Sequence, residues 1–258
     1  MDTIVNEDDY EIPCPKRPFH VAVDVDQTCN LRCKYCRDEI HINKEDNESL
    51  GIVTAKILED VVPYCGELML AGNGEVFASK YYQKILYAPN IKMGGQRLKL
   101  QLTTNAILLD ESKLQKLTEI YSHIELWISI DAASRAKYEE VRRGGCWETL
   151  LENLATVKKY RQEKRVHYLR FNFIVTSKSC YEMHNFVEMA KQFAADSVLF
   201  QKLEHTNVLS DEEYDTLSIF DSEGNIKDAY HYILEDPILD DPIVNRQNNV
   251  LSGKREKT

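Results

Sequence analysis

The sequence predicts an α/β fold in which six strand and helix units form a (β/α)6 partial barrel, followed by a short C-terminal extension. Short apolar or β-branched runs alternate with segments whose apolar residues recur every three or four positions, which is typical of βα units around a parallel sheet. The chain has 258 residues, enough for one barrel-type domain. We expect an acidic segment at 1–17, the core at 18–205 and the extension at 206–258, with the last ten or so residues disordered.

Composition and charge exclude several classes of partner. Hydrophobic residues make up 43% of the chain, but no apolar run approaches the length that spans a membrane. A formal net charge of −10 opposes binding to a phosphate backbone, so we expect no nucleic-acid partner. The acidic N-terminus lacks the basic start and apolar stretch of a secretion signal, and the seven cysteines show no disulfide-like framework. We therefore expect a cytoplasmic protein with no membrane partner.

Six segments are the expected strands, and helices are expected between them. In chain order the strands are His20–Asp26, Glu67–Gly72, Leu98–Thr104, Ile124–Asp131, Tyr168–Thr176 and Ser197–Leu203. No seventh strand is expected after Glu204. In the fifth strand, Arg170 and Asn172 should face the barrel interior if Phe171 and Phe173 face the helices.

The helices between these strands are expected to bury apolar stripes at three- and four-residue spacing. Asp110 is placed to cap a helix that starts near Glu111. The three stripes are Val53, Ile57, Leu58, Val61 and Val62; Leu150, Leu151, Leu154, Val157 and Tyr160; and Phe186, Val187, Met189, Ala190 and Phe193. We assign these stripes to the core and give them no further function.

Three cysteines directly after the first strand are candidate metal ligands. Cys29, Cys33 and Cys36 have the spacing C-x3-C-x2-C, and three thiolates on one short loop can surround a cuboidal iron–sulfur cluster. Such a cluster keeps one iron open, and an open position distinguishes a reactive metal site from a structural one. The alternative is zinc with His41 as a fourth ligand, although no second Cys or His pair occurs. Because the first strand ends here, the cysteines should lie at the C-terminal end of the barrel, where chemistry occurs in parallel α/β barrels.

The segment from Cys29 to Cys36, with Tyr35 before the last cysteine, resembles the signature of the radical SAM superfamily. It is most similar to the branch that holds peptide maturases and enzymes of sugar and cofactor pathways. The resemblance implies a [4Fe–4S] cluster on Cys29, Cys33 and Cys36, with S-adenosylmethionine (SAM) on the open iron. It also implies an electron from reduced flavodoxin or ferredoxin, and reductive cleavage of SAM to a 5′-deoxyadenosyl radical that takes hydrogen from the substrate.

Motifs after the second and third strands resemble SAM-binding motifs of the same family. Gly72-Asn73-Gly74-Glu75 resembles the Gly-Gly-Glu motif, with Val76 in place of the usual proline, and implies acceptors for the ammonium group of SAM. The alternative is an ordinary turn. Thr103-Thr104-Asn105 resembles Thr-Thr-Asn-Gly, with Ala106 in place of the glycine. Asn105 is a candidate contact of SAM, and the alternative is that these polar side chains close the strand end by hydrogen bonds.

The fourth and fifth strands supply the remaining candidates. Ser129-Ile130-Asp131 resembles Ser-Ile-Asp-Gly, which implies that Ser129 and Asp131 face the ribose or carboxylate of SAM, and that Arg143 pairs with the carboxylate. The alternative is that Arg142 and Arg143 are surface charges. The implied cofactor-binding set is Tyr35, Gly72, Asn73, Gly74, Glu75, Asn105, Ser129, Asp131, Arg143 and Asn172.

Four cysteines remain outside the motif. We expect Cys14, Cys65, Cys146 and Cys180 to be buried structural thiols. Radical epimerases of the family use a cysteine to return a hydrogen atom, and Cys146 and Cys180 are the candidates for that catalytic role. Because no cysteine follows Cys180, we expect a single cluster.

The substrate is expected to be a small polar metabolite such as a sugar derivative, or a peptide side chain. The alternative function is a non-catalytic iron–sulfur or zinc protein that binds a partner or transfers electrons. The motifs at successive strand ends favour the enzyme, because a binding module has no need of them.

Overall fold

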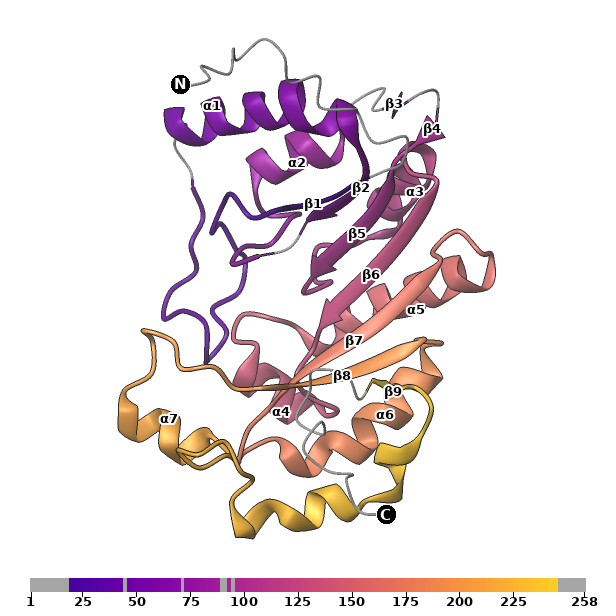
Figure 1. Cartoon of the computed structure of the whole chain (residues 1–258). Helices are drawn as coiled ribbons and strands as arrows, with labels where there is room; N and C mark the ends of the chain where they lie inside the picture. Colours follow the sequence, from indigo (N-terminus) through magenta and orange to yellow (C-terminus); the bar gives the residue numbers. More distant parts are fainter. Residues whose placement is uncertain (1–18, 44–45, 71, 89–91, 94–95, 246–258) are drawn as a thin grey trace, which may run out of the picture.

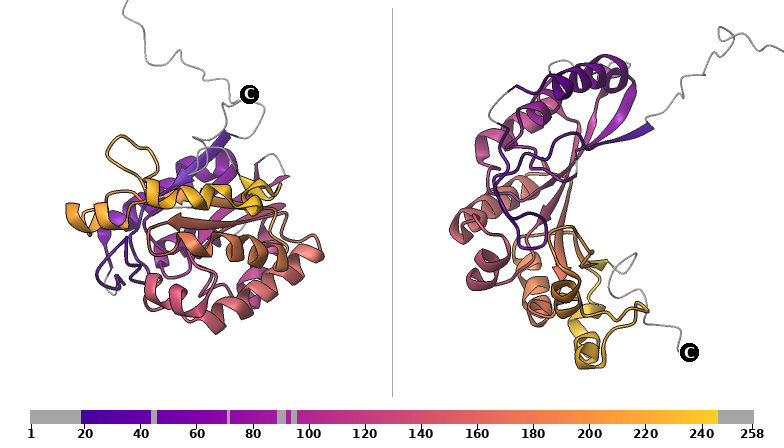
Figure 2. Two further views of the ribbon diagram at one scale, coloured as in Figure 1. Left: turned by 90° about the horizontal axis from the view of Figure 1, so that it is seen from below. Right: turned by 90° about the vertical axis from the view of Figure 1, so that its left-hand side faces the viewer.

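The computed structural model describes residues 19–43, 46–70, 72–88, 92–93 and 96–245. Its centre is one parallel sheet with the strand order β1-β2-β5-β6-β7-β8-β9 (Figure 1). The sheet is curved but not closed, and its helices lie along the outer side (Figure 2). This is an α/β fold of the partial-barrel type, as the sequence predicted. Cys14 and the expected disordered ends lie outside the described residues.

The strands of the main sheet follow the chain from one edge to the other. They are β1 (Phe19–Val23), β2 (Cys65–Leu70), β5 (Lys99–Thr104), β6 (His123–Ser129), β7 (Tyr168–Val175), β8 (Ser197–Lys202) and β9 (Val244–Asn245). A separate antiparallel hairpin consists of β3 (Lys92–Met93) and β4 (Gln96–Arg97). The parallel order with helical crossovers brings the carboxyl ends of all the long strands to one edge.

Seven α-helices and several short helical turns are present in the described part of the chain. The α-helices are α1 (Glu48–Lys56), α2 (Lys80–Leu86), α3 (Glu111–Ile120), α4 (Arg135–Val141), α5 (Trp147–Gln162), α6 (Met183–Gln192) and α7 (Asp211–Leu217). A π-turn (Ile57–Val61) and four 3-10 turns (Val62–Tyr64, Cys180–Glu182, Asp228–Glu235, Pro237–Asp240) complete them. None of these helices is both long and apolar enough to cross a bilayer, within the residues that the structure describes.

Helix ends follow the expected capping chemistry. Asp110 caps α3, as predicted, because its carboxylate accepts a hydrogen bond from the backbone N–H of Lys113 at 3.0 Å. Ser210 begins α7 with a reciprocal capping box, in which Ser210 and Glu213 each accept a hydrogen bond from the other's backbone N–H. These local bonds explain why the chain turns into helices directly after the loops that leave the sheet.

The two faces of the sheet differ in chemistry, as the alternation in β7 predicted. Phe171 and Phe173 are fully buried and pack on Phe186 of α6, with ring centroids 6.0 and 4.9 Å apart. Since side chains alternate along a strand, Arg170 and Asn172 lie on the concave face. The helices therefore cover an apolar convex face, and the polar residues line the inside of the partial barrel.

Three expectations about the elements were wrong. A seventh strand exists, since β9 pairs in parallel with β8, but it has only two residues and carries no periodic pattern. The β3–β4 hairpin was missed for the same reason. Val53 is 43% exposed although it was assigned to a buried stripe. The π-turn that follows α1 inserts an extra residue per turn, so one 3.6-residue stripe cannot run from Val53 to Val62.

Candidate active site

The loop that carries the three cysteines leaves β1 at the carboxyl edge of the sheet and is held by the buried carboxylate of Asp26. One oxygen of Asp26 accepts hydrogen bonds from the backbone N–H and hydroxyl of Thr28 (3.1 and 3.0 Å) and from the amide of Asn43 (2.9 Å). The other oxygen accepts a 2.6 Å bond from the hydroxyl of Ser79. One side chain thus joins both ends of the loop to the start of α2.

Backbone bonds then close the loop and attach it to the end of α4. Cys29 N–H donates to the carbonyl of His41 at 2.7 Å, which closes the loop on itself. Arg32 and Lys34 donate their N–H groups to the carbonyls of Arg143 (3.0 Å) and Val141 (2.9 Å) at the end of α4. The cysteine loop is therefore fixed against the segment that follows β6.

Each cysteine sulfur of the loop accepts an N–H hydrogen bond. Leu31 N–H donates to Cys29 Sγ at 3.5 Å, Arg142 Nη1 to Cys33 Sγ at 3.5 Å and Arg37 Nη2 to Cys36 Sγ at 3.6 Å. Burial raises the pKa of the Cys29 and Cys33 thiols. N–H donors directed at thiolate sulfur stabilise the charge of a cluster ligand and tune its reduction potential.

The donor set fits an iron–sulfur cluster better than a single ion. Among the described residues, no group of three or more His, Cys, Asp or Glu side chains is arranged to hold one metal ion, including the zinc arrangement with His41. A cuboidal cluster does not require such convergence, because each thiolate binds a different iron. Beside Cys33, moreover, the Arg142 Nε group is buried without an acceptor in the part of the chain described.

Arg142 is the arginine that the structure brings into the site, whereas Arg143 was the residue predicted. The Arg142 Nη2 lies 2.6 Å from Asp131 Oδ2. Only 11% of the Arg142 side chain and 3% of the Asp131 side chain are exposed. Burial raises the pKa of Asp131, and Arg142 opposes that rise. Burial also opposes the charge of Arg142, but Asp131, Cys33 and Tyr138 together outweigh burial, and the pKa of Arg142 is raised. No ion pair of the Arg143 side chain is present among the described residues, so its role stays a prediction.

The two glycines of Gly72-Asn73-Gly74-Glu75 allow the loop after β2 to approach the loop after β1. Gly72 has a φ of +143°, and a Cβ added there would lie 1.9 Å from Asp24 Oδ1. A Cβ at Gly74 would lie 2.2 Å from the carbonyl oxygen of Asp26. The glycines are therefore required for packing between two loops of the site, whatever ligand the loops also bind.

Glu75 and Asn105 connect the ends of β2 and β5. The fully buried Glu75 carboxylate accepts hydrogen bonds from Thr104 Oγ1 (2.7 Å), Asn105 N–H (2.8 Å) and Phe77 N–H (3.3 Å). Burial raises its pKa, and these donors counter that rise. The Asn105 amide donates to Asn30 Oδ1 at 3.0 Å, inside the cysteine motif. These hydrogen bonds close the strand ends, which was the alternative to a contact with SAM. Contacts of these residues with SAM remain predictions.

The carboxyl edge of the sheet also carries Ser129, Asn172 and Tyr35. Ser129 pairs with Asn172 across β6 and β7, and its partly exposed hydroxyl has no hydrogen-bond partner in the described part of the chain. The Asn172 amide oxygen accepts a bond from Arg170 Nε at 2.9 Å. Tyr35 is buried, and its hydroxyl lies 3.3 Å from Thr176 Oγ1 at the end of β7.

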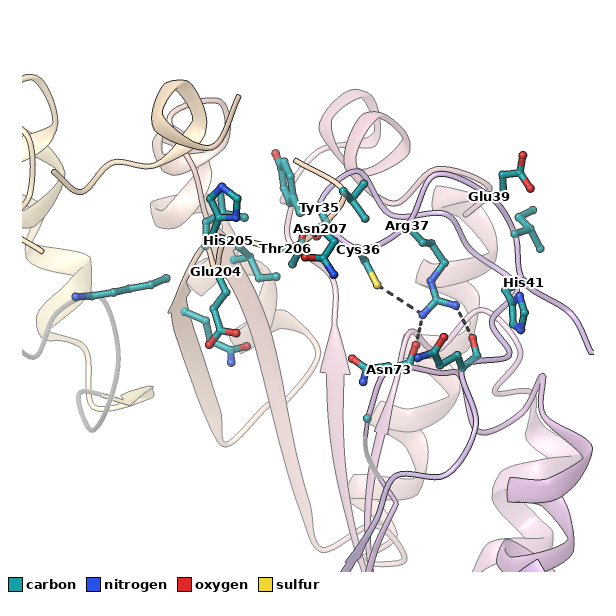
Figure 3. Close-up of a pocket in the computed structure, with 18 residues that line it drawn as sticks. Tyr35, Cys36, Arg37, Glu39, His41, Asn73, Glu204, His205, Thr206 and Asn207 are labelled. Carbon is teal, nitrogen blue, oxygen red and sulfur yellow. Dashed lines mark hydrogen bonds between the residues drawn. The ribbon is translucent and has the colours of Figure 1, made fainter. Parts of the chain in front are cut away.

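A cavity of about 930 Å³ opens beside the cysteine loop (Figure 3). Cys36 and Arg37 lie on one side of it, and Arg37 also donates to the backbone carbonyls of Gln27 (2.5 Å) and Asn73. On the other side lies the segment after β8, tied to the loop by a 3.1 Å bond from Thr206 Oγ1 to the carbonyl of Tyr35. The lining combines polar and apolar surface. The polar residues are Gln27, Glu39, His41, Asn73, Gln201, Lys202, Glu204, His205, Thr206 and Asn207, and the apolar ones are Ile40, Ile174, Leu203 and Val208.

The other cysteines lie away from this cavity. Cys180 is buried beneath the C-terminal turns, in a small pocket with Tyr232 and Leu239. Cys146 is exposed at the start of α5, contrary to the expected burial, and hydrogen bonds from Thr149 lower its pKa. Cys65 is fully buried in the core. A catalytic role for Cys146 or Cys180 stays a prediction, but neither side chain lines the cavity.

Sequence reasoning missed three residues that build the site: Asp26, Arg37 and Arg142. Asp26 accepts the N–H of Thr28 in an Asx-turn, but the sequence alone carries no signal that separates this Asp from others. Arg37 follows the last motif cysteine directly. For Arg142, the sequence offers two adjacent arginines and no local signal that separates them.

The fold and site define an open α/β barrel with a three-cysteine loop at the carboxyl edge of its strands. The family model described as "Radical SAM superfamily" matches residues 25–182, more than half of the chain. The chain therefore belongs to the radical SAM superfamily, whose enzymes use a [4Fe–4S] cluster and SAM for radical chemistry.

Two named relatives and one solved structure illustrate the similarity. The chain is 27% identical over 150 residues to an AdoMet-dependent heme synthase of Oleidesulfovibrio alaskensis, covering 57% of this chain and 37% of that protein. It is 31% identical over 149 residues to a GTP 3′,8-cyclase of Synechocystis, covering 54% and 41%. The chain thus spans about two fifths of the length of these relatives. The structure of Streptococcus suis SuiB bound to S-adenosylmethionine superimposes with a TM-score of 0.58 at 15% identity, covering 88% of this chain and 49% of that one, which shows the shared fold.

Proposed function

We propose that this chain binds a [4Fe–4S] cluster through Cys29, Cys33 and Cys36 and SAM at the carboxyl edge of the sheet. In this proposal it abstracts a hydrogen atom from a small polar metabolite, such as a sugar derivative, or from a peptide side chain, in the 930 Å³ cavity. The observation that carries it is the cysteine loop itself. All three sulfurs accept N–H bonds at the strand edge, and Cys36 lines the adjacent cavity.

The protein's own residues would bind and orient the cofactors. The Ser129 hydroxyl and the Asn172 amide, paired on adjacent strands, suit the hydroxyl groups of a ribose. Arg142 would hold Cys33 in place through its hydrogen bond to the sulfur. It would also neutralise the charge of Asp131 next to the SAM site. When bound, the cluster and SAM supply the radical that removes hydrogen from the substrate. The protein contributes position and the exclusion of water and oxygen.

The substrate class follows from the cavity lining. Gln201, Glu204 and Asn207 bear polar groups on the cavity wall, so a substrate with several hydroxyl, amide or charged groups is favoured over an apolar one. A peptide side chain presented at the open rim is compatible with the same lining. This polar wall supports the assignment to a small polar metabolite.

The electron donor would be a reduced flavodoxin or ferredoxin. Arg32 is exposed on the cysteine loop, and Lys34 lies near it with a 3.3 Å ion pair to Glu140. Positive groups around the cluster suit an acidic donor. A cluster with an open iron also requires a reducing compartment, on which ground we place the protein in the cytoplasm.

The test is anaerobic reconstitution with iron and sulfide, followed by reductant and SAM. Wild type is expected to hold about four iron atoms per chain and to form 5′-deoxyadenosine, because all three thiolate ligands are present. The variant Cys29→Ala, Cys33→Ala, Cys36→Ala should do neither, and Cys146→Ala is the matched cysteine control that should bind iron normally. A wild-type protein that binds a cluster and SAM but forms no 5′-deoxyadenosine would contradict the enzymatic role.

A further inference from the structure

The concave face of the sheet carries a layer of polar and aromatic side chains below the strand tips. Trp127 of β6 pairs in register with Arg170 of β7, two residues before the Ser129 and Asn172 pair. Two residues along a strand correspond to about 7 Å. Arg170 therefore lies one layer deeper inside the partial barrel than the residues assigned to the SAM ribose.

Arg170 is held in a defined position by two contacts. Its guanidinium carbon lies 3.3 Å from the centroid of a Trp127 ring, so that the planar cation stacks on the indole. Its Nε donates to Asn172 Oδ1 at 2.9 Å. Both contacts leave the two Nη groups available, and no acceptor for either of them is found among the described residues. The guanidinium is thus held in one orientation, and its two Nη groups have no acceptor among the described residues.

This arrangement differs from that of four other arginines with buried or half-buried side chains. Arg37, Arg142 and Arg161 each direct Nη groups at oxygen or sulfur acceptors of the chain. Arg165 offers the best comparison, because it also stacks on an aromatic ring, that of Tyr160, at 4.2 Å. Its Nη groups nevertheless bond to Glu163 and Thr118.

The surroundings of Arg170 leave its charge incompletely compensated. Burial lowers the pKa of Arg170 to about 10, and nearby Tyr168 and Glu125 offset only part of that shift. Glu125 is engaged elsewhere, since its Oε1 lies 3.1 Å from His123 Nε2. A desolvated cation is stabilised when an anion binds to it.

We propose that Arg170, stacked on Trp127, binds a carboxylate or phosphate group of the substrate on the concave face of the sheet. The guanidinium fork matches two oxygens of either group, and the stacked ring fixes its direction. This inference rests on the proposed function and narrows its substrate class to an anionic metabolite. Arg170 does not line the 930 Å³ cavity, so the anionic group would be anchored below the SAM layer while the rest of the molecule extends toward the strand tips and the cavity.

The test is anaerobic calorimetric titration of the cluster-loaded protein with inorganic phosphate, with succinate and with neutral erythritol, at constant ionic strength. Wild type should bind one of the two anions at one site, and erythritol should give no binding. Tighter binding of phosphate identifies a phosphorylated substrate, and tighter binding of succinate identifies a carboxylated one. Because a charged bidentate contact is lost, Arg170→Gln should weaken binding at least about 10-fold.

Control variants distinguish anion binding by Arg170 from a general effect of positive charge and from loss of folding. Arg165→Gln removes a stacked arginine whose Nη groups already have acceptors, so it should bind the anion as wild type does. Arg170→Lys keeps the charge but not the fork and should bind with intermediate affinity. In Trp147→Phe, where Trp127 is the remaining one of the two tryptophans, the anion should also change the tryptophan fluorescence. Equal weakening by Arg165→Gln, or wild-type affinity in Arg170→Gln, would overturn the proposal.

Iron content and SAM binding of the same preparations keep the two proposals apart. A normal cluster with no anion binding contradicts the subsite and leaves the proposed function intact. A chain that binds the anion through Arg170 but holds no cluster contradicts the proposed function instead.

Discussion

Replacing Arg142 by Gln is predicted to destabilise the fold by about 3 kcal/mol. The Asp131 side chain is only 3% exposed, and among the described residues it keeps one other partner, the N–H of Ile174 at 2.8 Å. Removing one member of a buried ion pair costs about 3–5 kcal/mol, because the other charge stays buried without compensation. The bond that Asp131 retains places the expected cost at the lower end of this range.

Urea unfolding followed by circular dichroism measures this cost, and Arg143→Gln is the matched control. Arg143 is the adjacent arginine and lacks an ion pair in the described residues, so its replacement should change the unfolding free energy by less than about 0.5 kcal/mol. A double variant, Asp131→Asn with Arg142→Gln, removes the unpaired charge. It should be less destabilised than the sum of the two single variants by more than about 1 kcal/mol.

Two results would refute this reasoning. Equal effects of Arg142→Gln and Arg143→Gln would show that the buried pair contributes no more than a surface charge. Strict additivity in the double variant would show that Asp131 and Arg142 do not interact. Iron content after reconstitution gives a second readout, since Cys33 loses its guanidinium donor only in Arg142→Gln.

Three further predictions concern the helix cap, the strand ends and the free cysteines. Asp110→Ala should cost about 1 kcal/mol at pH 7. Burial alone would raise the Asp110 pKa, but Lys113 and Ser112 lower it to about 2. The stabilisation by Asp110 is therefore fully present above pH 4. The difference in unfolding free energy between wild type and Asp110→Ala, measured in urea, should shrink as the pH falls toward 2. Glu75→Ala leaves three donors without an acceptor and should cost about 2–4 kcal/mol by the same assay. Glu75→Gln should retain part of the stability. An effect of Glu75→Ala below about 1 kcal/mol would contradict the role of Glu75 in joining the ends of β2 and β5. Cys146→Ala and Cys180→Ala should leave deuterium incorporation from solvent into the product unchanged, because neither lines the cavity; loss of incorporation in either variant would identify it as the hydrogen donor.

The sequence was sufficient for the features that local patterns encode. All six expected strands are present in the predicted order, since each is a long apolar or alternating run. The cap at Asp110 and the division of β7 into an apolar and a polar face depend on residues close in sequence, and both are confirmed. The cysteine motif identified the loop and the family because its spacing is itself the signal.

Features that depend on tertiary contacts were beyond the sequence. Which of Arg142 and Arg143 turns inward is decided by the last turn of α4, where Arg142 has a φ of −93° and a ψ of 57°. The role of Glu75 depends on where β5 ends in space, and no local pattern near Glu75 encodes this. The two-residue strand β9 is formed only because β8 offers an edge to it.

The bond between Thr206 and Tyr35 also constrains the order of events during synthesis. These residues are 171 positions apart, and Arg142 is 109 positions from Cys33. At typical translation rates the last of these partners emerges roughly ten to thirty seconds after the cysteines. The thiols therefore leave the ribosome long before the groups that enclose them exist. The native bonding of the cysteine loop can form only after β8 and the segment that follows it have been synthesised.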